Sequence, residues 1–203
     1  MQRPTIVAVL GVDGSGKTTQ TQLLAASLRR DGIAAAAYKN PGGRPWLNSV
    51  AHRFGKVDGP DLVGERAVVV LETVIRWLAI ARALIFAAVT GKVAVMDRYS
   101  FCQYAIMRAR GDRGERVVRR LFGVLPEPTV VCLLKAPPVV AQRRVELRGK
   151  DREDAGYLAA LEQAYRSLPE FPRFVEVDAS GQIDDVHRAL RTAVDSALAG
   201  RQH

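Results

Sequence analysis

A glycine-rich stretch near the start of the chain carries the strongest chemical signal. It runs from Gly11 to Thr18, reads Gly-Val-Asp-Gly-Ser-Gly-Lys-Thr, and matches the pattern G-x-x-x-x-G-K-[ST] at every position. Glycines let such a loop curl so that its backbone N–H groups face one centre, and a helix that starts at its end adds a positive terminus. Lys17 would reach the β- and γ-phosphates, and the Thr18 hydroxyl would ligate Mg²⁺. We therefore expect the stretch to bind a nucleoside triphosphate with Mg²⁺.

A second polar motif, Asp97-Arg98-Tyr99, directly follows the apolar run Val93–Met96. In parallel α/β sheets, ligands sit beyond the carboxyl ends of the strands. Asp97 is thus placed to contact Mg²⁺ or its waters, and Arg98 would lie beside the phosphates, where a fixed cation offsets developing charge. GTPases, ATPases and small-molecule kinases all share such motifs. The sequence has no Asn-Lys-x-Asp motif for reading guanine, which weakens the GTPase interpretation.

Cations elsewhere in the chain indicate what accepts the phosphoryl group. Lys39 and Arg44 bound a loop without a carboxylate, and Arg76 lies within a long apolar helix. Glu72 stands four residues before Arg76 and offers an i,i+4 ion pair, but a charge in an apolar helix more often faces a cleft or a partner. A hydroxyl acceptor needs a base for its proton, whereas a phosphate acceptor needs only cations to gather two anions. These cations, with Arg98, favour a phosphate acceptor.

Apolar patterning predicts strands that alternate with helices, which is typical of an α/β fold with a parallel sheet. The expected strands are 5–10, 33–38, 93–96, 129–134 and 174–177. The expected helices are 17–30, 65–90, 100–110, 115–122, 139–147, 157–167 and 183–198, with 44–64 irregular or weakly helical. The prediction is a single P-loop NTPase domain over residues 1–203, in which helices flank a five-stranded parallel sheet to give three layers.

Length, composition and charge exclude several classes of protein. The chain has 203 residues, is 48% hydrophobic and carries a formal charge of +9. Its apolar content excludes wholesale disorder, and two widely spaced cysteines, Cys102 and Cys132, read as reduced core residues rather than a disulfide scaffold. The apolar segment 67–89 contains three charged residues, each costing about 2.5–3.5 kcal/mol at a bilayer centre, so we expect no membrane span. We see no signal peptide and expect a cytoplasmic protein.

Basic residues concentrate in the middle of the chain. Residues 101–150 hold eleven basic and four acidic groups. Six of the arginines form one cluster, consisting of Arg108, Arg110, Arg113, Arg116, Arg119 and Arg120. Such a cluster suits a polyanion such as nucleic acid. A solvated helix face in an arginine-rich chain explains it too, and we favour that interpretation, so nucleic acid is not an expected partner.

The motifs taken together resemble the thymidylate kinase family of P-loop nucleoside monophosphate kinases, and the likeness covers most of the chain. Residues 11–20 look like the family's phosphate loop, and Pro41-Gly42-Gly43 resembles its loop after the second strand. Asp97-Arg98-Tyr99 matches its Asp-Arg-Tyr/His motif. Arg76 lies fifteen residues before Gly91, the family's spacing between an acceptor-binding Arg and the Gly before the third strand.

The C-terminal half carries further likeness to this family. Arg144, Arg148 and Asp151-Arg152-Glu153 look like its lid and the approach to it, so residues 148–155 are the expected lid segment. Residues 157–168 resemble the helix after the lid, and 177–179 resemble the end of the fifth strand, near the adenine. Closure of a lid would exclude water and limit wasteful ATP hydrolysis. Homodimers are usual in the family, so the resemblance implies one as a candidate assembly.

The resemblance implies transfer of the γ-phosphate of ATP to a nucleoside monophosphate, with dTMP as the expected acceptor and Mg²⁺ as cofactor. The catalytic residues it implies are Asp13, Lys17, Arg98 and Arg152. The ATP-binding residues it implies are Gly11, Asp13, Gly14, Ser15, Gly16, Lys17, Thr18, Thr19 and Arg144. The acceptor-binding residues are Asp13, Lys39, Arg44, Glu72, Arg76, Arg98 and Gln103, and the metal ligands are Thr18 and Asp97.

Five positions depart from the family pattern. Lys39-Asn40 replaces an Arg-Glu pair, Glu72 replaces the aromatic residue that stacks on thymine, Gln103 stands where an Asn or small polar residue is frequent, and Ile106 where an aromatic is common. The altered pocket leaves two alternatives open. One is a kinase of a nucleoside or other small metabolite with Glu72 or Glu65 as base. The other is a nucleotide-dependent regulatory or nucleic-acid-binding protein.

Overall fold

The computed structural model describes residues 5–43, 47, 52–53, 56, 64–146 and 154–199. Within these residues, five parallel strands form one sheet in the order β2-β3-β1-β4-β5. The strands are β1 (Ile6–Gly11), β2 (Ala35–Lys39), β3 (Val93–Asp97), β4 (Val130–Lys135) and β5 (Val175–Asp178). The helices are α1 (Lys17–Arg30), α4 (Glu65–Thr90), α5 (Ser100–Arg110), α6 (Glu115–Phe122), α7 (Pro138–Glu146), α8 (Ala155–Arg166), η1 (Phe171–Arg173) and α9 (Ile183–Ala199).

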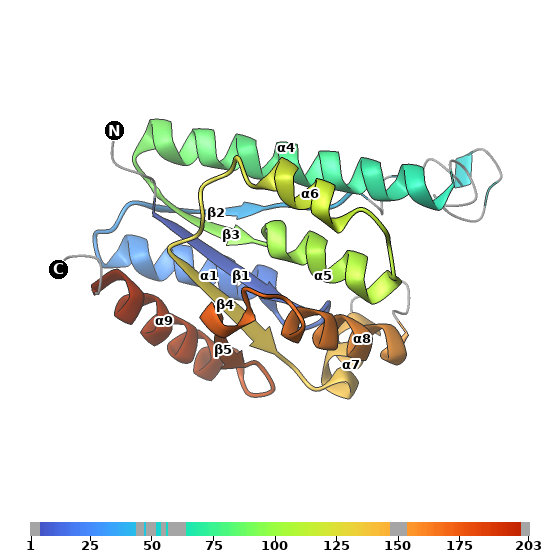
Figure 1. The fold of residues 1–203 in the computed structure, drawn as a ribbon. Coiled ribbons are helices and arrows are strands. Elements are labelled where there is room, and N and C mark those ends of the chain that lie inside the picture. Colours follow the sequence, from blue (N-terminus) through green and yellow to red (C-terminus); the bar gives the residue numbers. More distant parts are fainter. Residues whose placement is uncertain are drawn as a thin grey trace.

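The sheet is the middle of three layers, as Figure 1 shows. Helices α1 and α9 pack against one face, and α4 and α5 cover the other, with α8 packed on α5. Strand β1 is central, and all six of its residues are buried, which its uninterrupted apolar run predicted. The α/β fold with a five-stranded parallel sheet is therefore confirmed.

The strands reach slightly further at their carboxyl ends than apolar patterning predicted. Lys39 of β2 pairs in register with Asp97 of β3, and Lys135 of β4 pairs with Asp178 of β5. Backbone pairing does not depend on side-chain polarity, so the ladders continue through charged residues that patterning treats as strand ends. Polar side chains that end neighbouring strands therefore lie side by side at one edge of the sheet.

The predicted lid, residues 148–155, lies outside the described residues except at its end, and so does most of the segment 44–64. Both Cys102 and Cys132 are free thiols and buried, as their apolar surroundings predicted. No helix in the described part of the chain combines the length and hydrophobicity needed to span a bilayer.

Candidate active site

The glycine-rich loop connects the carboxyl end of β1 to the first turn of α1. At Gly14, φ is +85°, and a Cβ atom there would lie 2.1 Å from the carbonyl oxygen of Ala141 in α7. Only glycine satisfies both the left-handed conformation and this close approach. The N–H of Ser15 donates to the carbonyl oxygen of Val12 at 3.2 Å, and α1 begins at Lys17. The loop therefore ends at the positive terminus of α1, where an anion is stabilised.

Lys17 is folded back over this loop. Its side chain is only 5% exposed, and Nζ donates to the carbonyl oxygen of Val12 at 2.5 Å and to Oδ1 of Asp13 at 3.3 Å. Burial, and then the cation of Arg98, lower the pKa of Lys17. A bound phosphate would stabilise the charged form of Lys17, because it brings negative charge next to a buried ammonium that lies near the cation of Arg98.

Two oxygen-bearing side chains meet where α1 starts and β3 ends. The Thr18 hydroxyl donates to Oδ2 of Asp97 at 2.6 Å. Asp97 is buried, and its other oxygen, Oδ1, has no hydrogen-bond partner among the described residues. Hydroxyl and carboxylate oxygens are the ligands that Mg²⁺ takes from proteins, and Mg²⁺ is usually held by one or two carboxylates together with substrate phosphates. The donor set therefore fits Mg²⁺.

Arg98 forms the centre of the site. It is the one non-glycine residue with a positive φ (74°) in the described part of the chain. Its guanidinium pairs with Oδ1 of Asp13 in the glycine-rich loop. Burial alone would lower the pKa of Arg98, but the Asp13 carboxylate outweighs it, so the pKa lies above its ordinary value. Arg98 is therefore permanently charged and tied to the loop.

Asn40, which the sequence marked only as a departure, holds the backbone turn of Arg98. The Asn40 side chain is fully buried, and Nδ2 donates to the carbonyl oxygen of Arg98 at 2.8 Å. Its backbone N–H donates to the carbonyl oxygen of Asp97 at 3.1 Å. The residue that follows β2 thus holds the conformation of the residue that follows β3. The expected strands 33–38 and 93–96 end shortly before Asn40 and Arg98, and these neighbouring strand ends were the available signal.

Arg76 of α4 lies against the loop that follows β2. A Cβ atom on Gly42 would come within 2.5 Å of its NH2 atom, so the absence of a side chain there makes room for the guanidinium. Arg76 is only 3% exposed, and its Nε and NH1 have no hydrogen-bond partner among the described residues. Burial, and then the cation of Arg98, lower its pKa. These buried donors are available for an acidic or carbonyl oxygen from a ligand.

Gln103 of α5 adds a buried acceptor on the same side. Its Nε2 donates to the Thr73 hydroxyl at 3.1 Å, and that hydroxyl donates to the carbonyl oxygen of Val69 at 2.7 Å. Because the single hydroxyl proton is used, the amide nitrogen and not the oxygen must face Thr73. Oε1 of Gln103 is buried without a partner in the described residues. Helices α4 and α5 therefore carry buried donors on Arg76 and a buried acceptor on Gln103 that have no partner among the described residues.

Glu72 does not form the i,i+4 pair with Arg76 that the sequence offered as a structural explanation. Its carboxylate accepts a hydrogen bond from NH1 of Arg110, at the end of α5, at 2.7 Å. Both side chains of this pair are mostly buried. Sequence reasoning had placed Arg110 in a solvated basic cluster, and no local pattern indicated a partner 38 positions away.

The remaining predicted residues are less closely assembled. Lys39 lies at the exposed end of β2, beside Asp97. Arg144 of α7 donates from NH1 to the carbonyl oxygen of Ala179 at 2.8 Å, so it fixes the loop between β5 and α9. Ser15 is buried in the glycine-rich loop, and Thr19 lies in the first turn of α1. Arg44 and Arg152 lie outside the described residues.

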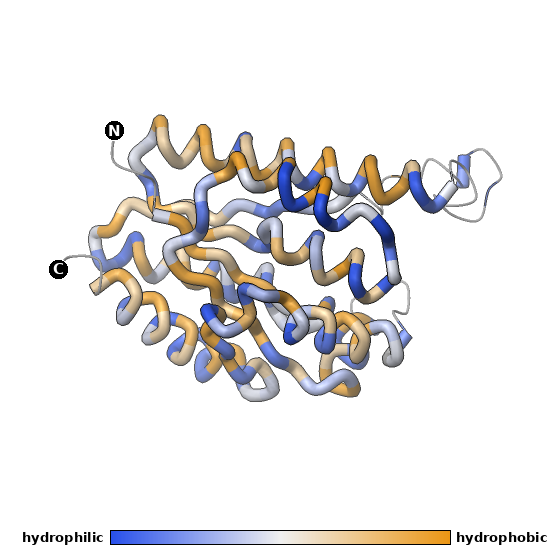
Figure 2. The backbone as a smooth tube through the Cα atoms, in the orientation of Figure 1, coloured by the Kyte–Doolittle hydropathy of each residue, from blue (hydrophilic) through white to orange (hydrophobic). Residues whose placement is uncertain are grey.

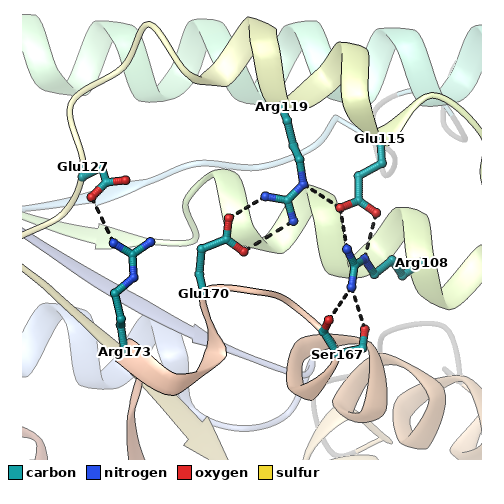
Figure 3. Close-up of polar contacts among 7 residues, drawn as sticks. All are labelled: Arg108, Glu115, Arg119, Glu127, Ser167, Glu170 and Arg173. Carbon is teal, nitrogen blue, oxygen red and sulfur yellow. Dashed lines mark hydrogen bonds and ion pairs between the residues drawn. The ribbon is translucent and has the colours of Figure 1, made fainter.

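The basic cluster divides into two sets. Arg108 and Arg119 both form ion pairs with Glu115, at 2.8 and 2.6 Å. Figure 3 shows that Arg108 also donates to Ser167 and that Arg119 also binds Glu170. These contacts join α5 and α6 to the end of α8 and the turn after it. Arg110 binds Glu72, so three arginines of the cluster form ion pairs within the chain. The exposed ones are Arg113, Arg116 and Arg120.

Comparison with known proteins agrees with this geometry. A family model described as thymidylate kinase matches residues 9–190. The chain belongs to the thymidylate kinase family. A probable thymidylate kinase of Pyrococcus horikoshii is 30% identical over 207 residues, covering 98% of this chain and 99% of that protein. A probable thymidylate kinase of Archaeoglobus fulgidus is 28% identical, covering 95% and 96%. A thymidylate kinase of Xanthomonas euvesicatoria is 28% identical, covering 97% and 85%.

Membership of the thymidylate kinase family makes the chain a nucleoside monophosphate kinase that uses ATP as donor. The resemblance stated from the motifs is thereby confirmed, as is the prediction of an enzyme. In this chain, the loop before α1 and the Asp97-Arg98 turn lie at the carboxyl ends of the strands, and Arg76 of α4 lies against the loop that follows β2.

Proposed function

We propose that this kinase transfers the γ-phosphate of ATP to dTMP and releases dTDP and ADP. The observation that carries the proposal is the place of Arg98. Its guanidinium pairs with Asp13 beside Lys17 on the donor side, and its charge is close enough to Arg76 to depress the pKa of that residue. One cation therefore faces both the donor loop and the acceptor side, as transfer between two phosphates requires.

On the donor side, we propose that ATP binds across the glycine-rich loop and the start of α1. Lys17 would turn from the Val12 carbonyl to the β- and γ-phosphates, and Thr19 would lie beside them. Thr18 and Asp97 would hold Mg²⁺, which supplies charge neutralisation of the phosphate oxygens. Arg144 would act at the adenine end, through the loop after β5 that it holds. Arg152 would approach the transferred group from the lid.

On the acceptor side, we propose that the monophosphate lies between Arg98, Arg76 and the cations Lys39 and Arg44. Asp13 would face the sugar. The free donors of Arg76 and the free acceptor of Gln103 complement an imide edge, in which a carbonyl stands next to an N–H, and thymine has such an edge. A thymine that hydrogen-bonds both side chains would satisfy two buried polar groups, each of which costs about 1–3 kcal/mol when it lacks a partner.

The geometry speaks against a hydroxyl acceptor. Glu72, one candidate base, has its Oε2 already occupied by a hydrogen bond from NH1 of Arg110 at 2.7 Å. Glu65, the other candidate, is exposed in the first turn of α4. Transfer to a phosphate needs neither residue as a base, because the acceptor oxygen is already ionised.

We further propose that the enzyme is a cytoplasmic homodimer, joined along the outer face of α4. Large apolar side chains are exposed there at helical spacing, and the hydrophobic colour follows the outer edge of α4 in Figure 2. They are Val70, Val74, Leu78, Ile85, Phe86 and Val89. A second copy would bury this stripe. Light scattering should give the mass of a dimer, and Leu78→Asp with Ile85→Asp should give a monomer.

The test of the reaction is ADP release from MgATP with a panel of acceptors: dTMP, dUMP, the other nucleoside monophosphates, and thymidine. We expect turnover with dTMP and none with thymidine. Turnover with another monophosphate alone would keep the mechanism and refute dTMP as the acceptor. Turnover with thymidine alone would refute phosphate-to-phosphate transfer. As a control, Arg113→Ala changes an exposed arginine and should leave the rates unaltered.

A further inference from the structure

The ion pair between Glu72 and Arg110 has no part in the transfer described above, yet it is built into the wall of the acceptor site. Its side chains are 5% and 18% exposed, and the N–O distance is 2.7 Å. Tyr157, in the first turns of α8, also interacts with Arg110: burial lowers the pKa of the Arg110 guanidinium, and Glu72 and Tyr157 raise it. Contacts from α4 and α8 thus hold Arg110 in one orientation at the end of α5. Removing a charge from water is costly unless its geometry and partners are good, so this pair is a specific arrangement.

Glu72 has a second cation nearby that it does not bind. Arg76 lies four residues further along α4, so the two side chains project from the same face of the helix, about 6 Å apart along its axis. An acidic residue four positions before a basic one is the favourable orientation for an ion pair on a helix. Both residues are buried, where attraction between opposite charges is stronger than in water. Nevertheless, Nε and NH1 of Arg76 have no hydrogen-bond partner within the described residues.

The ion pair with Arg110 explains why Glu72 does not bind Arg76. The guanidinium of Arg110 holds Oε2 of Glu72, so the carboxylate is engaged with α5 and not with its neighbour on α4. Without Arg110, the buried carboxylate of Glu72 would lose this ion pair while lying next to Arg76, whose Nε and NH1 have no hydrogen-bond partner among the described residues. A shift of Glu72 toward Arg76 would occupy the donors that an acceptor needs. A carboxylate at that place would also repel an anionic ligand.

We propose that Arg110 is a positioning residue for the acceptor site: by holding Glu72, it keeps the guanidinium of Arg76 available to the nucleoside monophosphate. The inference rests on the proposed role of Arg76 in binding the acceptor. Arg110 itself acts through Glu72. The ion pair also makes an acidic residue tolerable at a position that borders an anionic substrate.

The first test is Arg110→Ala, assayed with MgATP and dTMP. We expect KM for dTMP to rise at least about tenfold, because Glu72 then competes for Arg76. A tenfold change corresponds to about 1.4 kcal/mol, which is within the range of coupling between residues of one salt-bridge network. We expect KM for ATP, and kcat at saturating dTMP, to stay within about threefold of the wild type, because the donor loop and Arg98 are untouched.

The decisive test adds Glu72→Gln to Arg110→Ala. The amide has no charge to compete for Arg76, so KM for dTMP should return most of the way to the wild-type value. If the ion pair has only a structural role, KM for dTMP should stay raised in the double variant, because both partners of the pair are lost. Arg108→Ala is the matched control, because it breaks another ion pair of α5, with Glu115, away from the acceptor site. It should leave KM for dTMP unchanged.

An unchanged KM in Arg110→Ala, or a rise that persists in the double variant, overturns the inference. If Arg110→Ala does not fold, Arg110→Lys takes its place, because lysine keeps the charge but holds Glu72 less firmly. The expected rise in KM is then smaller, and Glu72→Gln should again remove it. If the wild-type enzyme phosphorylates dTMP but the variants do not show the expected changes in KM, only the role of Arg110 is refuted. A wild-type enzyme that phosphorylates no monophosphate refutes the proposed function, and this inference with it.

Discussion

Asn40 offers a direct test of how the site is held together. Asn40→Ala removes the Nδ2 donor that binds the Arg98 carbonyl oxygen at 2.8 Å, in a fully buried position. The lost hydrogen bond contributes about 1 kcal/mol, and the carbonyl left without its donor costs about 1–2 kcal/mol more. Arg98 also holds a φ of 74°, a conformation that persists in a residue with a side chain only when its surroundings enforce it. We expect the free energy of unfolding to fall by about 2–3 kcal/mol.

Thermal unfolding and steady-state kinetics measure the two consequences of Asn40→Ala. For a chain of this size, the expected loss lowers Tm by about 4–12 °C. If the turn relaxes, Arg98 leaves its position between donor and acceptor, so kcat should fall at least about tenfold while KM for ATP stays within about threefold. Gln163→Ala, which removes an exposed amide on α8, is the control and should change neither quantity. A normal kcat in an Asn40→Ala enzyme of lowered Tm would show that Asn40 does not position Arg98.

Three further outcomes are expected. Thr18→Val removes the hydroxyl that binds Asp97 at 2.6 Å; we expect kcat to fall roughly 100-fold and the Mg²⁺ requirement to rise, with Thr18→Ser close to wild type in a Mg²⁺ titration. Hydrogen bonding by Arg108 lowers the pKa of Glu115 below its unfolded value. Stability from this pair is therefore present above the unfolded pKa and lost as pH falls through the lower folded pKa; Tm measured from pH 6 to 3 should drop, and less steeply in Arg108→Ala. Burial raises the pKa of Cys132 to about 12, so a thiol reagent at pH 8 should label it only after unfolding, and fast labelling of the folded enzyme would contradict this burial.

The donor half of the site could be predicted because its residues are consecutive. The apolar run of β1, the glycines and Lys17 form a local unit whose geometry follows from backbone chemistry. Asp97 and Arg98 were predictable for a related reason: ends of parallel strands meet at one edge of a sheet. The α/β fold followed from the alternation of apolar patterns, and helices α1 and α4 have the predicted bounds.

The acceptor half was less predictable because its contacts join distant positions. No local pattern links Asn40 to Arg98, or Glu72 to Arg110, at separations of 58 and 38 residues. The sequence offered Glu72 a partner four residues away, and the fold supplied a different one. Arg144 shows the same limit, since its hydrogen bond to Ala179 spans 35 positions. Side-chain pairing between helices depends on how they pack, which periodicity alone does not determine.

The position of each strand in the sheet gives the two halves of the site different mechanical character. Strand β1, from which the donor loop leaves, is central and wholly buried, whereas β2, which leads to Asn40 and Gly42, is an edge strand with alternating exposure. Edge strands open at lower free energy than central ones, so amide hydrogens should exchange slowest in β1 and faster in β2. The ATP-binding loop is therefore attached to the most rigid strand of the sheet, whereas the loop on the acceptor side is attached to a strand that opens more readily.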